Sequence, residues 1–248
     1  MISIEYLYPE VANLYGDKFN IIFLEKCLKE SNVKYEIIET HLNDTPVFTK
    51  KDVDLVYMGS MSESNQLLVI SKLEKFKDIL QYKIRDGKNF LFTGNSFEVL
   101  LRYIEDDKGK KKDGLKLLNY SSRYDLKHRY NTLFMGSFHD EIDNKDIDIL
   151  GHKATFSFTY GNNKKETLFK AVKGCGINKE SDIEGIRKNN LFATYLIGPF
   201  LVLNPDFTKY LMKKIGVKEP KIVFEEEAYK CFNQRLEEFK RPSTNYLQ

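Results

Sequence analysis

The stretch Phe90-Leu91-Phe92-Thr93-Gly94-Asn95-Ser96-Phe97-Glu98-Val99-Leu100-Leu101 contains the features that decide the fold. It begins as an apolar run typical of a buried strand, passes through a polar turn and continues with the apolar spacing of a helix. Strand–turn–helix elbows of this kind hold the nucleophile of many α/β hydrolytic and acyl-transfer enzymes. The apex here is Gly94, which has no side chain. The stretch therefore predicts an α/β protein whose elbow lacks a nucleophile at its apex.

Alternating strand and helix patterns lie on both sides of this elbow. Strands are expected at residues 2–8, 33–39, 53–58, 89–92, 132–138, 154–160 and 191–196, and helices at residues 20–30, 66–82, 205–215 and 224–240. Strands that alternate with helices predict a largely parallel sheet with helices on both faces. Ligands of such sheets bind at the carboxyl ends of the strands. Two turns, Gly59-Ser60 and Gly94-Asn95-Ser96, follow predicted strands at such ends.

The composition of the 248-residue chain is that of a globular protein, with 42% hydrophobic and 30% charged residues. The net charge of +3 gives no reason to expect a nucleic acid or an anionic membrane as a partner. No apolar run approaches the ~20 residues of a membrane-spanning helix, and the N-terminus alternates like a strand rather than a signal peptide. Three widely spaced cysteines without a CxxC pair indicate a reduced, cytoplasmic protein without a structural zinc site.

The turn residues offer hydrogen-bond donors but no obvious nucleophile. The backbone N–H groups of Asn95 and of the Gly59-Ser60 loop are candidates for an oxyanion hole across a shared pocket. The hydroxyl of Ser96 is more typical of a first-turn helix donor than of a nucleophile. None of the four histidines has the spacing of a metal pair, so no metal site and no cofactor are expected. His152 is a candidate pH-sensitive group.

Several stretches together resemble the CobB/CobQ-like class I glutamine amidotransferases, and above all the GatD-type glutaminase subunit of lipid II isoglutaminyl synthase. The N-terminal part of the resemblance is Tyr6-Leu7-Tyr8-Pro9-Glu10 with Asn13-Leu14-Tyr15-Gly16-Asp17-Lys18. The C-terminal part consists of Glu184-Gly185-Ile186, Asn189, Thr194-Tyr195-Leu196, Gly198-Pro199 and Asn204-Pro205. An amidotransferase-like domain is therefore expected over residues 1–218, followed by a C-terminal helical extension over residues 219–248.

The resemblance implies a flavodoxin-like three-layer α/β sandwich. Active members of the family hydrolyse glutamine with a cysteine at the elbow and a distant histidine, beside a glycine-rich loop. The ammonia passes to a synthase partner, which is Mur-ligase-like in the GatD-type branch.

The family's catalytic residues are absent from the matching positions of this sequence. The family's Cys-Gly-Gly-Tyr-Gln falls on residues 94–98, so Gly94 occupies the nucleophile position. Its Thr-Tyr-Leu-His-Gly-Pro falls on residues 194–199, so Ile197 occupies the base position. The glycine-rich loop Gly-Gly-Gly-Gln-Asp falls on residues 59–63, where only the first glycine is retained. A substrate-holding arginine of the family is matched by Arg129.

The double substitution predicts a catalytically inactive, amidotransferase-like protein, because glutaminase chemistry needs both a thiolate and a base. We expect a binding or regulatory subunit of a cell-wall (lipid II amidation-like) or related synthase complex. A Mur-ligase-like chain is the expected partner, and a small ligand could occupy the former glutamine pocket. The candidate pocket consists of Gly59, Ser60, Gly94, Asn95, Ser96 and Arg129.

Two enzymatic alternatives stay open at this point. In the first, the pocket performs different chemistry with Ser96, Glu98 or His152. In the second, the chain is an active glutaminase subunit of a cobyric-acid-synthase-like or lipid II isoglutaminyl synthase-like complex, with Cys175 or Cys231 as a non-standard nucleophile.

Overall fold

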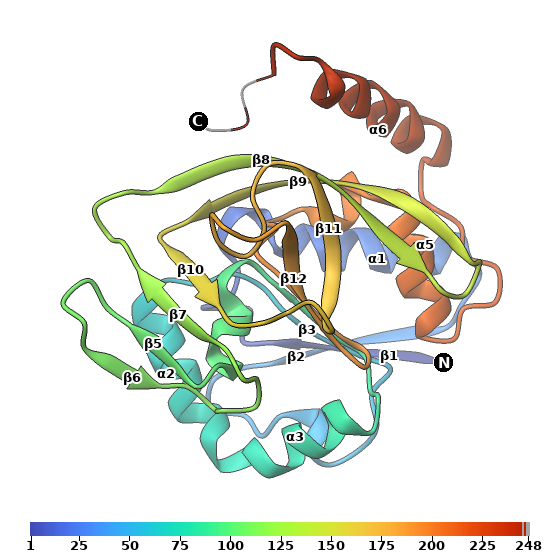
Figure 1. Ribbon diagram of the computed structural model, residues 1–248. Helices are drawn as coiled ribbons and strands as arrows, with labels where there is room; N and C mark the ends of the chain where they lie inside the picture. Colours follow the sequence, from blue (N-terminus) through green and yellow to red (C-terminus); the bar gives the residue numbers. More distant parts are fainter. Residues whose placement is uncertain (245, 247–248) are drawn as a thin grey trace.

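The computed structural model describes residues 1–244 and 246, and its centre is a nine-stranded sheet (Figure 1). One half of this sheet is parallel, in the order β2-β1-β3-β4-β13. These strands are β1 (Ile2–Leu7), β2 (Tyr35–Thr40), β3 (Leu55–Met58), β4 (Phe90–Thr93) and β13 (Leu191–Thr194). This is the flavodoxin-like order, in which ligands bind at the carboxyl ends of the strands beside the switch point. The switch point here lies between β1 and β3.

The other half of the sheet is antiparallel and continues from β13 in the order β12-β11-β8-β9. These strands are β8 (Tyr130–Asp140), β9 (Lys145–Thr155), β11 (Thr167–Lys173) and β12 (Ile183–Lys188). The predicted α/β class with a parallel core is confirmed, and the antiparallel half extends that core. The sequence prediction missed β11 and β12, and it placed one strand where β9 ends and β10 begins.

A second, four-stranded sheet has the order β10-β7-β5-β6. Its strands are β5 (Tyr103–Glu105), β6 (Lys111–Asp113), β7 (Ser121–Tyr124) and β10 (Ser157–Tyr160). The sequence does not signal β5 to β7, because they are short and polar and all three residues of β6 are exposed.

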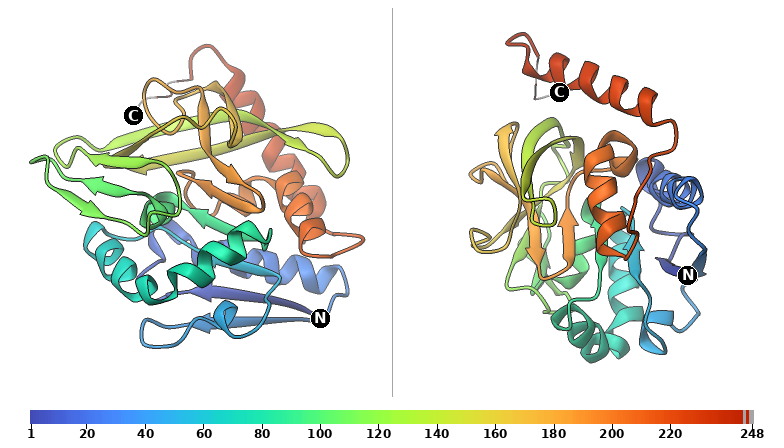
Figure 2. Two further views of the ribbon diagram at one scale, coloured as in Figure 1. Left: turned by 60° about the horizontal axis from the view of Figure 1, so that its bottom comes forward. Right: turned by 90° about the vertical axis from the view of Figure 1, so that its right-hand side faces the viewer.

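Helices cover both faces of the large sheet (Figure 2). One face packs against α1 (Lys18–Glu30), α4 (Phe200–Leu203) and α5 (Pro205–Lys214), and the other against α2 (Glu63–Leu73) and α3 (Lys77–Arg85). Successive side chains of β4 point to opposite faces of the sheet, so both faces are apolar. Phe90 and Phe92 pack on the α2/α3 side, and Leu91 packs on the α1/α5 side. The three layers agree with the predicted sandwich.

Two predicted helices are wrong in detail. The single helix expected over residues 66–82 is divided into α2 and α3 by a 3₁₀ turn, η3 (Glu74–Phe76). The elbow continues into a 3₁₀ helix, η4 (Gly94–Leu100), rather than an α-helix. The helix ends at Leu100 because the carbonyls of Val99 and Leu100 accept from Leu115 N and Leu117 N instead of from a further helical turn. Two further 3₁₀ turns are η1 (Leu14–Gly16) and η2 (Val47–Thr49).

The last helix, α6 (Glu225–Lys240), lies outside the three layers (Figure 2). Its Leu236 and Phe239 pack on Met135 of β8 and Leu150 of β9. The extension expected over residues 219–248 includes residues 245, 247 and 248, which lie outside the described residues. Among the residues that the structure describes, no helix combines the length and apolar character needed to cross a membrane.

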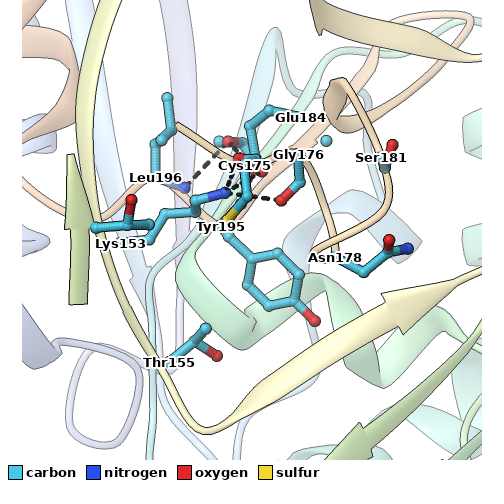
Figure 3. A network of polar contacts seen from close by, with 12 residues as sticks. Lys153, Thr155, Cys175, Gly176, Asn178, Ser181, Glu184, Tyr195 and Leu196 are labelled. Atoms are coloured by element: carbon cyan, nitrogen blue, oxygen red, sulfur yellow. Dashed lines mark hydrogen bonds and ion pairs between the residues drawn. The ribbon is translucent and has the colours of Figure 1, made fainter. Parts of the chain in front are cut away.

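A buried ion pair joins β9 and β12 within the antiparallel half of the large sheet, and its carboxylate also bonds to the end of β13 (Figure 3). Lys153 of β9 is 2% exposed, and its Nζ donates to Glu184 Oε2 at 3.0 Å, to Gly176 O at 2.7 Å and to Cys175 O. The other oxygen of Glu184 accepts from Thr194 Oγ1 at 3.0 Å and from Tyr195 N at 2.7 Å. The pair therefore fixes the segment that runs directly into position 197.

Replacing Lys153→Met leaves the carboxylate of Glu184 buried without its cation, so we expect the free energy of unfolding to fall by about 3–5 kcal/mol. The double variant Lys153→Met/Glu184→Gln should recover part of this loss. Urea unfolding followed by circular dichroism measures both. Lys111→Met, which removes an exposed ion pair with Glu105, is the matched control and should change stability little. A loss at Lys153 no larger than that of the control would contradict the role of the pair.

Candidate functional site

A cavity of about 220 Å³ opens at the carboxyl ends of the parallel strands. Leu14 and Tyr15 line it from the loop after β1, residues 60–63 from the loop after β3, Gly94 and Asn95 from the elbow, and Ile197 from the loop after β13. Arg129, at the start of β8, lines the cavity together with residues 154–156 from the turn between β9 and β10. The cavity is therefore built at the switch point, where flavodoxin-like sheets bind ligands.

Four of the six predicted pocket residues lie together around this cavity: Ser60, Gly94, Asn95 and Arg129. Gly59 and Ser96 are not part of the lining. Gly59 serves packing, because a Cβ there would lie 2.6 Å from both Ala12 O and Asp17 Cβ. Ser96 is fully buried, and its hydroxyl donates to Thr93 O at 2.7 Å and to Met58 O at 3.1 Å. The Ser96 hydroxyl is therefore committed to the backbone of the elbow.

The apex of the elbow is closed by the side chain of Ser60. Gly94 has a φ of +62°, and a Cβ at this position would lie 2.4 Å from Ser60 Cβ. That distance is far below any normal carbon–carbon contact, so no side chain fits at position 94 while Ser60 keeps its place. The elbow therefore has the left-handed backbone that glycine readily adopts and no room for a cysteine.

Ser60 is held by the buried carboxylate of Asp17. The Oδ2 atom of Asp17 accepts from Ser60 N at 2.7 Å and from the Ser60 hydroxyl, and its Oδ1 accepts from Thr93 Oγ1 at 3.1 Å. Burial raises the pKa of Asp17, while these hydrogen bonds act in the opposite direction. The predicted oxyanion hole is corrected here, because the Ser60 N–H faces Asp17 instead of pairing with Asn95 across the pocket.

Asn95 connects the elbow to the loop after β3. Its Oδ1 accepts from Met61 N at 3.0 Å, and its Nδ2 donates to Met61 O at 2.8 Å. The elbow backbone is also held from β13, because Gly94 N donates to Leu196 O at 3.3 Å. These bonds fix the three loops of the floor relative to one another.

A buried polar network lies beneath the cavity and is centred on Glu98. This carboxylate is fully buried and accepts from Tyr195 OH at 2.5 Å, Ser157 Oγ at 2.5 Å and Gln66 Nε2 at 3.0 Å. Burial raises the pKa of Glu98, and its three hydrogen bonds lower it. Glu98 therefore holds η4 against α2, β10 and the end of β13, and it is not part of the cavity lining.

Among the described residues, the histidines and cysteines do not line the cavity. His152 of β9 is half-buried, and its carbonyl accepts from Ile197 N at 3.0 Å. Burial and the nearby charge of Arg129 lower the pKa of His152. Cys27 is buried within α1, and Cys231 is exposed on α6. Among the described residues, those that line the cavity include neither a cysteine nor a histidine.

Two residues of opposite charge line the cavity near its mouth, Arg129 and Glu63. The guanidinium of Arg129 lies over the rings of Tyr15, at 5.4 Å from the centroid, and Phe156, at 5.2 Å. No binding role was predicted for Glu63 or Tyr15 from the sequence. Both lie in loops that follow predicted strands, and this position is the signal that could have identified them. No group of three or more metal-ligating side chains occurs among the described residues.

The comparisons with known proteins agree with this geometry. A family model described as a CobB/CobQ-like glutamine amidotransferase domain matches residues 3–205. Two relatives carry the name lipid II isoglutaminyl synthase (glutamine-hydrolyzing) subunit GatD. That of Staphylococcus aureus (strain N315) is 29% identical over 86% of this chain and 84% of its own length. That of Streptococcus pneumoniae (strain ATCC BAA-255 / R6) is 26% identical over 87% of this chain and 82% of its own length.

A solved structure supports the fold alone. The PurLQS structure from Thermotoga maritima aligns with a TM-score of 0.57 at 15% identity, and the alignment covers 86% of this chain and 97% of the matched chain.

The contact between positions 60 and 94 can be tested by a double-mutant cycle. Gly94→Ala places a Cβ against Ser60 at a left-handed φ, so we expect a loss of roughly 2–4 kcal/mol in the free energy of unfolding. In a Ser60→Gly background, Gly94→Ala should lower the free energy of unfolding by about 1 kcal/mol less, or by a still smaller amount, because the Ser60 Cβ that the new side chain would clash with is gone. Urea unfolding of all four proteins measures the coupling. Equal costs in both backgrounds would contradict the steric account.

The buried Glu98 should make stability depend on pH. Because its folded-state pKa is raised, its favourable contribution is present below its unfolded pKa, about 4.3, and is lost as the pH rises through the folded value. The free energy of unfolding of Glu98→Gln, taken relative to the unmodified protein, should therefore increase with pH from about 4 upward. Urea unfolding across this pH range measures the slope, with the exposed Glu30→Gln as a control. A flat or falling difference would contradict the raised pKa.

Proposed function

The chain belongs to the CobB/CobQ-like glutamine amidotransferase domain family, and we propose that it is a member that does not hydrolyse glutamine and acts as a binding subunit. The observation that carries the proposal is the elbow. Gly94 stands at the nucleophile position, and the space for a side chain there is filled by Ser60. A cysteine and a base act as a unit in such chemistry, so the absence of either removes most of the catalytic advantage.

The base position is occupied by Ile197, which lines the same cavity and is 5% exposed. An alkyl side chain cannot move a proton. The two substitutions lie on different loops, after β4 and after β13, and both face one cavity. This convergence supports loss of the reaction as a whole rather than a shift of one group.

The substitutions at positions 60 and 94 are physically coupled. The resemblance matches Ser60 with a glycine and Gly94 with a cysteine, and the structure has room for a Cβ at only one of these two positions. Ser60 also gives the Asp17 carboxylate two of its hydrogen bonds. We infer that Ser60 stabilises an elbow that has lost its nucleophile.

Other nucleophiles are poorly placed for the alternative of an active hydrolase. The Ser96 hydroxyl is buried and donates to Thr93 O of the elbow and Met58 O of β3. Cys231 is exposed on α6, which packs on β8 and β9, and Cys175 lies in the turn whose carbonyls accept from Lys153. Neither cysteine lines the cavity among the described residues.

The names of the two curated relatives describe a subunit of a glutamine-hydrolysing synthase. By this similarity we propose that the present chain also acts within a complex, with a Mur-ligase-like chain as its partner. The role left to a subunit without catalytic residues is to bind that chain, a ligand in the cavity, or both.

The proposal predicts that the purified protein releases no ammonia from L-glutamine above the buffer blank, alone or with a co-purified partner. The reason is the absence of a thiolate and a base at positions 94 and 197. A coupled glutamate dehydrogenase assay measures turnover, with the Streptococcus pneumoniae relative as the positive control. Robust turnover would contradict the assignment, and its loss in Ser96→Ala or Cys175→Ala would identify the nucleophile.

A further inference from the structure

We propose that the cavity above Gly94 binds a free α-amino acid whose side chain ends in an apolar group, of the size of leucine or methionine, in preference to glutamine. This rests on the proposed function, because it requires a site that binds without hydrolysing.

The mouth offers two charges of opposite sign. Arg129 is exposed and Glu63 is partly exposed, whereas the floor residues are almost completely buried. Within the described part of the chain, neither Arg129 nor Glu63 has an ion pair or a side-chain hydrogen bond. Two uncompensated charges on one small cavity match the carboxylate and ammonium groups of a zwitterion. The rings of Tyr15 and Phe156 hold the guanidinium at the mouth.

The polar side chains further inside are already engaged. Ser60 donates to Asp17, the amide of Asn95 is paired with the backbone of Met61, and the hydroxyl of Thr155 bonds with Ser157. A ligand that needs a new side-chain partner at the floor would have to break one of these bonds.

The floor itself is apolar. Ile197 is 5% exposed, Met61 is 2% exposed and Tyr195 is 2% exposed. Gly94 adds no side chain between them. A polar amide placed here would lose its hydrogen bonds with water without replacing them at Ile197, whereas an alkyl or thioether end would not. The substitution of the base position therefore changes the preferred ligand as well as removing the chemistry.

The size of the cavity fits this class of ligand. Its volume of about 220 Å³ lies below the roughly 300–1,000 Å³ of pockets for drug-sized molecules. With the charged groups at the mouth, the side chain of a single amino acid would extend to Ile197.

Isothermal titration calorimetry of the full-length protein tests the proposal, with L-leucine, L-methionine and L-glutamine as ligands. We expect leucine or methionine to bind at least about tenfold more tightly than glutamine, the ratio that one unpaired amide group produces. N-acetyl-leucine, which lacks the ammonium group, and leucinamide, which lacks the carboxylate, should each bind more weakly than leucine.

Three variants and two control variants assign these preferences to residues. Arg129→Ala and Glu63→Gln should each weaken leucine binding, whereas Arg123→Ala, an exposed arginine of β7 outside the cavity, should leave it unchanged. Ile197→Asn should reduce the preference for leucine over glutamine, and Ile197→Val should retain it. Thermal melting of each variant identifies any that fails to fold, in which case the ligand series on the unmodified protein decides.

Ammonia release is measured in the same glutamine samples, so the two proposals can fail separately. Glutamine that binds as tightly as leucine without being hydrolysed would overturn the apolar preference and leave the proposed function intact. Hydrolysis of glutamine would overturn the proposed function. Absence of binding by all three amino acids at millimolar concentrations would overturn the amino-acid site.

Discussion

The hydrogen bond from the Ser60 hydroxyl to the buried carboxylate of Asp17 is the contact on which the rest of the site depends. It joins the loop after β1 to the loop after β3 at the switch point of the sheet. Together with the bond from Ser60 N to the same carboxylate, it holds Ser60 where its Cβ occupies the space that a side chain at position 94 would need. One residue thus bonds a buried carboxylate through its hydroxyl and occupies the space at the apex of the elbow with its Cβ.

Buried polar groups support the floor on every side. Asp17, Glu98 and the Lys153–Glu184 pair are all fully or nearly fully buried, and each is hydrogen-bonded to loops that line the cavity or lie next to it. Such groups are costly unless they are paired, so they keep the loops in one arrangement. The cavity is therefore a preformed site, and among the described residues its lining includes no cysteine or histidine. Preorganisation of this kind suits ligand binding as well as catalysis.

Much of this could be predicted from the sequence, and the failures have physical reasons. Apolar strands such as residues 90–93 predicted the α/β class, and the turns Gly59-Ser60 and Gly94-Asn95-Ser96 after predicted strands indicated the region of the pocket. The short strands β5 to β7 carry no periodic signal, and the end of η4 depends on hydrogen bonds from residues 115 and 117. The sequence placed Ser60 and Gly94 in one pocket. It did not reveal that Ser60 excludes a side chain at position 94, because the two residues are far apart in sequence and meet only in the folded structure. The place of Glu98 beneath the cavity, hydrogen-bonded to Ser157 and Tyr195, likewise depends on tertiary structure.

The central claim is that this cavity has no nucleophile that can attack a glutamine-like carbonyl. Covalent labelling by a glutamine-analogue electrophile tests it most directly, with intact-mass and peptide mass spectrometry as the measurement. The account predicts no adduct that accumulates with time and is suppressed by excess glutamine. A glutamine-protected adduct on Ser96, Cys175 or any residue lining the cavity would contradict it.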